Sequence, residues 1–327
     1  MTGARPLPGQ PLALGPGPEF DRIRKIAFLL REQRSGIGDD CGLFQEGGGF
    51  VALSTDVSVE GVHFRLDWIS PEEAGWRATA AALSDLAAEG AEPIGVLCAV
   101  TMPATAPEGE LLELMAGASA AAAAVGSQVL GGDLASGPAW SVAVTVVGRT
   151  RAPVTRGGAE PGDGVWVTGF LGGSRAALMA WQQGREPLPA ARTRFAHPEA
   201  RIAAGRWLGR NGARAMIDLS DGLAGDAWHL AAASQVSLMI DLDSVLVSAE
   251  TELEAKRLGI SAQQFAAEGG EDYELLAALP AGFDAANEFL RECGIPLTQI
   301  GDVAEGSGVR FLLSGREMVL KGFNHFG

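Results

Sequence analysis

Several aspartates in this chain stand where a carboxylate could meet a ligand. Ser54, Thr55 and Asp56 directly follow the apolar run 50–53, which is typical of a buried strand. In an open α/β sheet, ligands bind just beyond the carboxyl ends of the strands. A single aspartate after a strand is more often only a turn residue. The sequence therefore makes Asp56 a candidate site residue, with the turn role as its alternative.

The same pattern of an acid beside glycine or a hydroxyl recurs along the chain. Carboxylates that converge repel one another unless cations lie between them. Mg²⁺ prefers hard oxygen ligands and usually takes one or two carboxylates together with phosphate oxygens. The acids therefore predict a site for several Mg²⁺ ions between phosphorylated ligands, provided that they converge. The further acids are Asp40, Asp85, Asp133, Asp218 and Asp221.

Other residues are suited to binding an anion. Gly131 and Gly132 would let backbone N–H groups approach a phosphate, and Ser220 could cap a helix whose N-terminus attracts anions. Ser220 could equally be a helix cap and nothing more. His63 and Arg156 could contact an anionic substrate, although such single residues are more often simply solvated.

Composition narrows the class of protein. The 327 residues are long enough for two domains, and a net charge of −15 without any Lys/Arg-rich stretch argues against nucleic-acid binding. The 3 cysteines lack C-x-x-C spacing, so we expect neither a disulfide framework nor a zinc site. Residues 1–18 do not resemble a signal peptide, and the Ala-rich segment 111–129 is too weak for a membrane span. We expect a cytoplasmic protein without a membrane partner.

The elements that must position these residues alternate between strands and helices. We expect a disordered Pro/Gly-rich tail at 1–18, an N-terminal domain at 19–150 and a C-terminal domain at 151–327. Asp56 would open a loop at 56–64, Asp85 would lie in a helix at 71–89, and Asp133 would lie in a turn at 131–133 after a short strand at 129–130. Further helices are expected at 19–33, 107–125, 174–183, 198–211, 222–233 and 283–293. The alternation predicts an α/β or α+β fold.

Familiar nucleotide and hydrolase motifs are missing. The sequence contains no G-x-x-x-x-G-K-[ST] loop, no G-x-G-x-x-G after a strand, no protein-kinase H-R-D, no H-E-x-x-H and no G-x-S-x-G. The chemistry therefore has to come from the aspartates themselves.

Six motifs occur in an order that resembles the thiamine-monophosphate kinase family. They are GIGDDC (36–41), STDVSVEGVHF (54–64), LSDLAAEGAEP (83–93), LGGD (130–133), IDLSDGL (217–223) and GGEDYEL (269–275). Each motif is weak alone, but the ordered set is specific and covers residues 20–327. The family belongs to the superfamily named for aminoimidazole ribonucleotide synthetase.

The resemblance implies two α/β domains, a homodimer built on a shared β-barrel, and ATP-dependent phosphorylation of thiamine monophosphate by in-line transfer with several Mg²⁺ ions. Asp56, Asp85 and Asp133 would be central to catalysis. The implied metal ligands are Asp40, Ser54, Thr55, Asp56, Asp85, Asp133, Asp218 and Asp221. Gly132, Asp133, Arg156 and Ser220 would contact the nucleotide, and His63, Glu271 and Phe323 the thiamine phosphate. Asn324 departs from the acid that the family's C-terminal motif would place there.

Two alternatives remain open at this point. One is a sister ATP-dependent synthetase acting on another small substrate, although MTGARPLPGQ lacks the cysteine and lysine expected of a selenophosphate synthetase. The ending His325-Phe326-Gly327 likewise lacks the C-terminal cysteine of the hydrogenase-maturation member. The other alternative is a non-catalytic binder of nucleotide or thiamine phosphate, which would not need so many acids.

Overall fold

The computed structural model describes residues 10–30 and 36–323. Residues 1–9 of the predicted tail and Asn324 lie outside these residues. Residues 10–17 form neither helix nor strand, yet they contact the rest of the protein: the N–H of Leu12 donates to the Ile37 carbonyl at 3.2 Å, and Arg24 donates to the Gly15 carbonyl at 2.8 Å. The helix predicted at 19–33 is α1 (Pro18–Leu30), as far as it is described.

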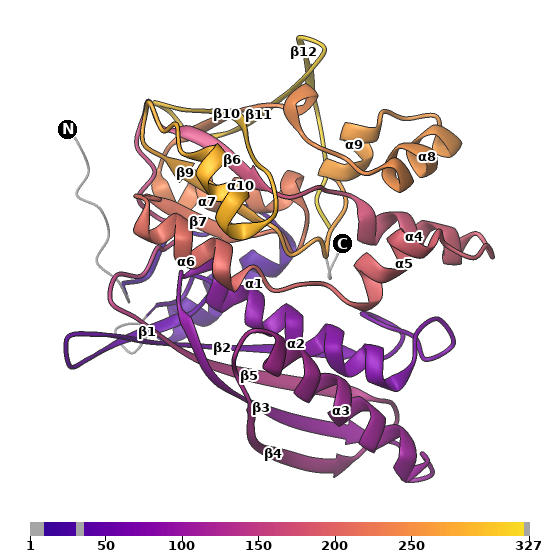
Figure 1. Cartoon of the computed structure of the whole chain (residues 1–327). Coiled ribbons are helices and arrows are strands. Elements are labelled where there is room, and N and C mark those ends of the chain that lie inside the picture. Colours follow the sequence, from indigo (N-terminus) through magenta and orange to yellow (C-terminus); the bar gives the residue numbers. More distant parts are fainter. Residues whose placement is uncertain (1–9, 31–35, 324–327) are drawn as a thin grey trace.

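The first sheet carries its two long helices on one face. Its strand order is β1-β2-β5-β3-β4, and only β3 and β4 run parallel. Helices α2 (Pro71–Ala88) and α3 (Glu108–Ala124) pack against each other and cover the sheet, in purple in Figure 1. Both helices were predicted. The strands are β1 (Gly42–Glu46), β2 (Gly49–Val59), β3 (Glu92–Met102), β4 (Val129–Ser136) and β5 (Ser141–Thr150).

Two segments predicted as turns are strands. β2 continues through Asp56, which pairs with Val144, and ends only at Val59. β4 includes Gly131, Gly132 and Asp133, and Asp133 pairs with Ala99. The predicted loop at 56–64 and the predicted turn at 131–133 were therefore wrong at these residues. Pairing with one long neighbouring strand, β5 for Asp56 and β3 for Asp133, satisfies backbone hydrogen-bonding groups and outweighs the local preference of Asp and Gly for turns.

The second sheet is larger and mostly antiparallel. Its strand order is β12-β11-β8-β10-β6-β9-β7. The strands are β6 (Gly164–Thr168), β7 (Ala215–Asp218), β8 (Ser237–Asp241), β9 (Leu275–Leu279), β10 (Leu297–Ala304), β11 (Gly308–Leu313) and β12 (Arg316–Met318). A short 3-10 helix, η2 (Leu242–Ser244), follows β8.

Seven α-helices accompany the described part of the second sheet. The helices α4, α6, α7 and α10 correspond to predicted helices, whereas α5, α8 and α9 were not predicted. They are α4 (Gly173–Gln182), α5 (Pro189–Ala196), α6 (Ile202–Arg210), α7 (Leu223–Ser234), α8 (Ala249–Leu258), α9 (Ala262–Ala267) and α10 (Ala286–Cys293). None of the helices within residues 10–30 and 36–323 is both long and apolar enough to cross a membrane.

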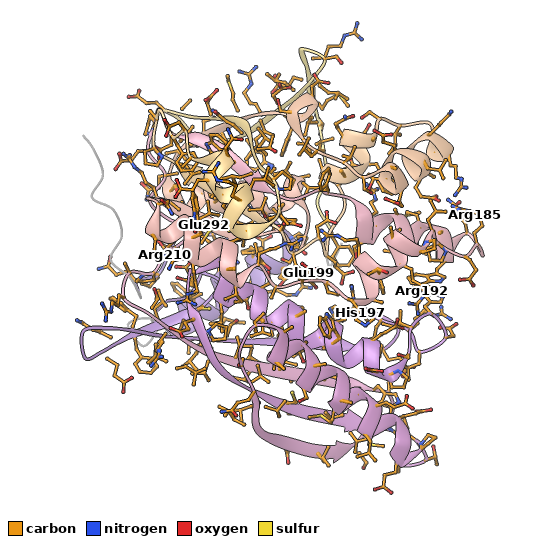
Figure 2. All side chains as sticks on the ribbon, in the orientation of Figure 1. Arg185, Arg192, His197, Glu199, Arg210 and Glu292 are labelled. Atoms are coloured by element: carbon orange, nitrogen blue, oxygen red, sulfur yellow. The ribbon has the colours of Figure 1, made fainter. Side chains whose placement is uncertain are left out.

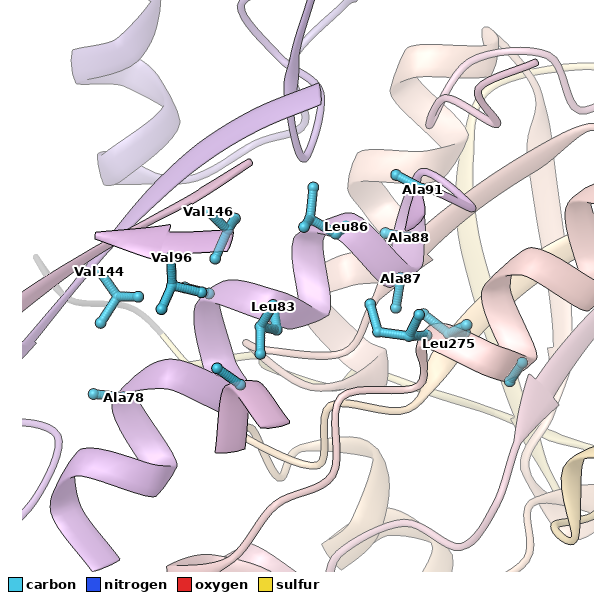
Figure 3. Packing of buried hydrophobic residues seen from close by; sticks show 14 of the residues in the cluster. Ala78, Leu83, Leu86, Ala87, Ala88, Ala91, Val96, Val144, Val146 and Leu275 are labelled. Carbon is cyan, nitrogen blue, oxygen red and sulfur yellow. The ribbon is translucent and has the colours of Figure 1, made fainter. Parts of the chain in front are cut away.

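Helix α2 lies between the first sheet and the second half of the chain. Ser70 starts it with a capping box to Glu73. Figure 3 shows Leu83 and Leu86 of α2 facing Val96, Val144 and Val146 of the first sheet, with Leu275 on the other side. This sandwiched helix carries Asp85.

Two glycines let neighbouring helices approach α2 closely. A Cβ on Gly117 of α3 would lie 1.8 Å from the Glu72 carbonyl oxygen, and one on Gly205 of α6 would lie 1.9 Å from that of Ala87. Any larger residue would push these helices away from α2.

Ion pairs and hydrogen bonds join the two halves of the chain beside α2. Arg192 of α5 donates to both carboxylate oxygens of Glu73, at 2.6 and 2.8 Å, and the Trp76 indole donates to the Pro198 carbonyl at 2.9 Å. Figure 2 shows Arg192 and His197 at this boundary. A bidentate pair fixes orientation as well as distance, so the segment 189–198 holds the halves in register across the site.

Candidate active site

A cleft of about 1300 Å³ brings together most of the predicted site residues. It is bordered by β2, α2, the end of β7 and the turn at 268–273. The convergence on which the metal prediction depended is therefore present. The predicted residues that line the cleft are Asp40, Ser54, Thr55, Asp56, His63, Asp85, Arg156, Asp218, Ser220, Asp221, Glu271 and Phe323.

Three carboxylates from distant parts of the sequence meet at the floor of the cleft. Oxygens of Asp40, Asp85 and Asp218 all lie within 4.8 Å of one another. Asp40 precedes β1, Asp85 lies in the last turns of α2, and Asp218 ends β7. Each is therefore fixed by a different element, so the cluster depends on the assembled fold.

The electrostatics of this cluster disfavour bare carboxylates. Burial, and then the charge of Asp40, raises the pKa of Asp218 to about 8. Burial, and then the charges of Asp56 and Asp218, raises the pKa of Asp85 well above its usual value, although the Ser54 hydroxyl offsets part of the shift. Groups in this state ionise when a cation is nearby. The donor set of hard, buried oxygens therefore fits Mg²⁺.

Arg156 is held against the acids. Its guanidinium donates to both oxygens of Asp40, at 3.0 and 2.7 Å, and its backbone N–H donates to Asp39 at 2.9 Å. Burial by itself lowers the pKa of Arg156, but the charge of Asp40 and the side-chain hydrogen bonds to Asp40 outweigh it, so the pKa of Arg156 is raised. Arg156 thus supplies a fixed positive charge beside the carboxylates.

The segment 269–274, which leads into β9, is hydrogen-bonded to the segment that follows β7. The N–H of Glu271 donates to the Ser220 carbonyl at 2.7 Å, and the N–H of Tyr273 donates to that of Leu219 at 2.9 Å. The Glu271 carboxylate pairs with Arg77, a buried side chain of α2. Glu271 thus lies next to the Asp218–Asp221 turn.

Glu274, at the end of the same segment, fixes it to the protein interior. It is fully buried, and Arg201 donates to both of its oxygens at 2.9 and 2.6 Å. Arg194 donates at 2.8 Å and Thr168 at 2.7 Å. Burial by itself raises the pKa of Glu274, but the two guanidiniums outweigh it and the pKa is lowered. The sequence analysis recognised the motif GGEDYEL, but it did not predict that the arginines and the threonine would pair with Glu274.

Aromatic side chains line the part of the cleft formed by α4, α5 and the segment before α2. Trp68 and Trp181 stack with ring centroids 5.4 Å apart and an interplanar angle of 6°. Phe195 meets the Trp181 ring edge-on at 5.2 Å. His63 lies along the same wall, where its Nδ1 accepts the N–H of Val59 at 3.0 Å. The cleft thus combines carboxylates with an aromatic wall.

Some predicted residues are placed differently. Gly132 and Asp133 are exposed on β4, an edge strand, and do not line the cleft. Thr55 borders the cleft, but its hydroxyl bonds that of Thr145 at 2.8 Å. Side chains alternate along a strand, so Thr55 points away from the face that carries Ser54 and Asp56.

Ser220 does not cap α7. The N-cap of α7 is Gly222, and within the described residues no side chain caps it. The carboxylate of Asp226 accepts the N–H of Asp221 at 3.1 Å and fixes the turn from inside the helix. Asp221 and Gly222 lie between Ser220 and Leu223, the first residue of α7, so the predicted cap at Ser220 was wrong.

Sequence reasoning missed other acids and bases in and behind the cleft. Oxygens of Asp221 and Asp226 and a nitrogen of His229 lie within 4.8 Å of one another. Glu89 forms a similar group with Asp39 and Asp40. Helical spacing could have revealed these residues in the sequence. His229 follows Asp226 by three residues, and Glu89 follows Asp85 by four, so each pair shares a helix face.

Comparison with known proteins places this fold and site in a family. Residues 38–150 match the AIR synthase related protein N-terminal domain, and residues 160–314 match the corresponding C-terminal domain. The thiamine-monophosphate kinase of Mycobacterium tuberculosis is 35% identical over 322 residues, which cover 94% of this chain and 92% of that protein.

Solved structures give the same result. A structure described as AaThiL complexed with AMPPCP and TMP superposes with a TM-score of 0.85 at 33% identity, over 95% of this chain and 97% of that one. The hydrogenase maturation protein HypE in complex with ATP has a TM-score of 0.72 over 94% of this chain and 96% of that one, but only 18% identity, so it shares the fold alone. The chain therefore belongs to the thiamine-monophosphate kinase family, within the AIR synthase-related proteins.

Proposed function

We propose that this protein transfers the γ-phosphoryl group of ATP to thiamine monophosphate and so produces thiamine diphosphate and ADP. The observation that carries the proposal is the convergence of Asp40, Asp56, Asp85 and Asp218 on one cleft, in a chain whose relatives are thiamine-monophosphate kinases. The cleft volume of about 1300 Å³ exceeds the roughly 300–1,000 Å³ typical of a pocket for one small ligand. It leaves room for both substrates.

The reaction would be a direct in-line displacement. A phosphate oxygen of thiamine monophosphate attacks the γ-phosphorus, a new P–O bond forms, and the bond to the ADP oxygen breaks. A phosphate monoester has its second pKa near 6, so the attacking oxygen is deprotonated at neutral pH. The chain then needs no general base, and its task is to align two anions and neutralise their charge.

The acids of the cleft fit this task. Asp40, Asp56, Asp85, Asp218 and Asp221, with the Ser54 hydroxyl, would hold several Mg²⁺ ions. When bound, these ions would supply the positive charge that offsets the repulsion between the phosphates. Arg156 would add a fixed charge at the nucleotide phosphates, since its guanidinium is already oriented by Asp40.

The thiamine moiety would bind at the aromatic wall. Its thiazolium ring is cationic, and cations are attracted to the faces of tryptophan rings. Trp68 and Trp181 line the cleft with their rings stacked on each other, so the thiazolium would bind beside this pair, and Glu271 adds a carboxylate on the same cleft. His63 would contact the substrate phosphate, and Phe323, which borders the cleft, would cover its ring.

We also propose that two copies pair through the first sheets to form a shared β-barrel. Phe44, Val57 and Leu97 of that sheet are 49%, 50% and 39% exposed, an apolar surface that a second copy would cover. Gly132 and Asp133 lie on the edge strand of the same sheet and outside the cleft. Their proposed nucleotide and metal roles therefore require the partner copy.

The proposal is tested by measuring ATP consumption with thiamine, thiamine monophosphate and aminoimidazole precursors as acceptors. We expect turnover only with thiamine monophosphate, and thiamine diphosphate as the product. Turnover with an aminoimidazole precursor instead would indicate a sister synthetase. Tight binding of ATP and thiamine monophosphate without any turnover would indicate a non-catalytic binder.

A further inference from the structure

Glu89 is a buried carboxylate that the proposed phosphoryl transfer does not use. It follows the last residue of α2 and has no exposed surface. Neither of its oxygens has a hydrogen-bond donor among the described residues. Leaving a buried polar group without a partner is unfavourable, and the effect is larger for a charged group. A proton or a cation must therefore neutralise the buried Glu89 carboxylate.

Its surroundings make the bare anion still less favourable. Burial, and then the charges of Asp39 and Asp40, raises the pKa of Glu89 well above its usual value. The N–H of Cys41 opposes this shift but does not reach hydrogen-bonding geometry. The C-terminus of a helix also carries partial negative charge, and Glu89 is the C-cap of α2.

The neighbours of Glu89 supply the remaining ligands of a cation site. One oxygen each from Asp39, Asp40 and Glu89 lie within 4.8 Å of one another. Two oxygens bound to one ion are separated by at most about twice the metal–oxygen distance, roughly 4.2 Å for Mg²⁺ and about 5 Å for Ca²⁺. The three oxygens can therefore share one ion with little movement.

The local charge also matches a divalent ion. Asp39, Asp40 and Glu89 bring three negative charges, and Arg156 offsets one of them through its bidentate contact with Asp40. Two negative charges remain, which one divalent cation balances. Asp39 and Asp40 border the cleft, so an ion can enter from it.

We propose that Asp39, Asp40 and Glu89 form a structural site for one hard divalent cation, behind the carboxylates assigned to phosphoryl transfer. The ion would bind without nucleotide and would fix the Gly-rich turn at 36–41 to the end of α2. Because it needs no substrate, this site does not rest on the proposed function. It shares Asp40 with the floor of the cleft and would hold that residue in place.

The test counts bound Mn²⁺ without nucleotide, from the electron paramagnetic resonance signal of free Mn²⁺. The variants are Glu89→Met, which replaces the acid by an apolar side chain of similar length, and Glu92→Gln. Glu92 serves as the control because it is half-exposed and lies near Arg149 and Arg206, outside the cluster. Thermal unfolding in EDTA and in Mn²⁺ provides a second readout.

We expect Glu89→Met to bind one Mn²⁺ fewer per chain than wild type, and Glu92→Gln to bind the same number. Glu89→Met should be at least as stable as wild type in EDTA but gain less from Mn²⁺, because its buried charge is gone. Should it fail to fold, Asp39→Asn, whose amide oxygen can still accept the N–H groups of Asp40 and Arg156, must lose one ion instead. An unchanged number of ions overturns the site and leaves Glu89 as a buried, protonated acid.

Discussion

Asp56 acts on its neighbours mainly through charge. Burial, and then the charge of Asp40, raises its own pKa, and its charge in turn raises that of Asp85. These acids repel one another in the folded chain, which an enzyme tolerates only where cations are to be bound. In the proposed function, Asp56 would therefore lower the stability of the fold and serve as a metal ligand.

We predict that Asp56→Asn lowers turnover of thiamine monophosphate by at least about a hundredfold, because the amide keeps the shape but removes a charged metal ligand. Its melting temperature should equal or exceed that of wild type, since one repulsive charge is gone. Steady-state kinetics at saturating Mg²⁺ and a thermal melt measure both effects. Asp284→Asn, exposed and outside the cleft, is the control. Near-normal turnover in Asp56→Asn would rule out the assigned role.

The ionised form of Glu274 stabilises the fold, in contrast to that of Asp56, because folding lowers the pKa of Glu274. The stabilisation is complete above the pKa of glutamate in the unfolded chain, about 4.3, and is lost as pH falls through the lower folded value. At pH 7, Glu274→Gln should be about 3–5 kcal/mol less stable, because two arginines lose their buried partner. Urea unfolding at pH 7, 5 and 3.5 should show this gap shrink at the lowest pH. A gap that is constant across all three would contradict the ion-pair account.

The sequence predicted the helices and strands whose hydrophobic pattern and end signals are strong. Helix α2 was recognisable from Pro71 and its Ala-rich body, and it places Asp85 where expected. The turns assigned to Asp56 and Asp133 were wrong because neighbouring strands, which local sequence does not reveal, extended β2 and β4. Helix α8, with the polar sequence AETELEAKRL, has no clear apolar stripe and was missed.

The same limit applied to parts of the site. The motifs located Asp40, Asp85, Asp218 and Glu271, because these acids occur in a recognisable order. Glu89 and Glu274 lie inside two of those motifs, but their importance follows from burial and from partners more than 40 residues away in sequence. Burial of an acid cannot be deduced from composition, because acids are rarely buried.

The C-terminal residues Gly322 and Phe323 lie beside the turn that carries Asp221, where Phe323 is proposed to contact thiamine monophosphate. The N–H of Phe323 donates to the Asp221 carbonyl at 3.0 Å, and a Cβ on Gly322 would lie 2.7 Å from the Gly225 Cα. Gly322→Ala should therefore displace Phe323 from the cleft and raise the KM for thiamine monophosphate about tenfold, or about 1.4 kcal/mol. The KM for ATP should not change. Gly109→Ala, where a Cβ meets nothing within 4 Å, is the control, and an unchanged KM in Gly322→Ala would refute this role of the segment.

At the scale of the whole molecule, the first sheet predicts self-association. Its half-exposed apolar face would be covered in a dimer. We expect wild type to sediment as a dimer, and Val57→Glu to sediment as a monomer because a charge would be buried at the interface. Leu112→Glu, a matched change on exposed α3, should remain dimeric. A monomeric wild type would contradict the shared barrel.

We propose that acids from both halves of the chain hold metal ions between two phosphorylated substrates. This proposal is tested most directly by a crystal structure with Mn²⁺, a non-hydrolysable ATP analogue and thiamine monophosphate, with manganese located by anomalous diffraction. We predict manganese bound to Asp40, Asp56, Asp85 and Asp218, in contact with the phosphates of both ligands. Both ligands bound in the cleft without manganese at these carboxylates would rule out this role of the acids.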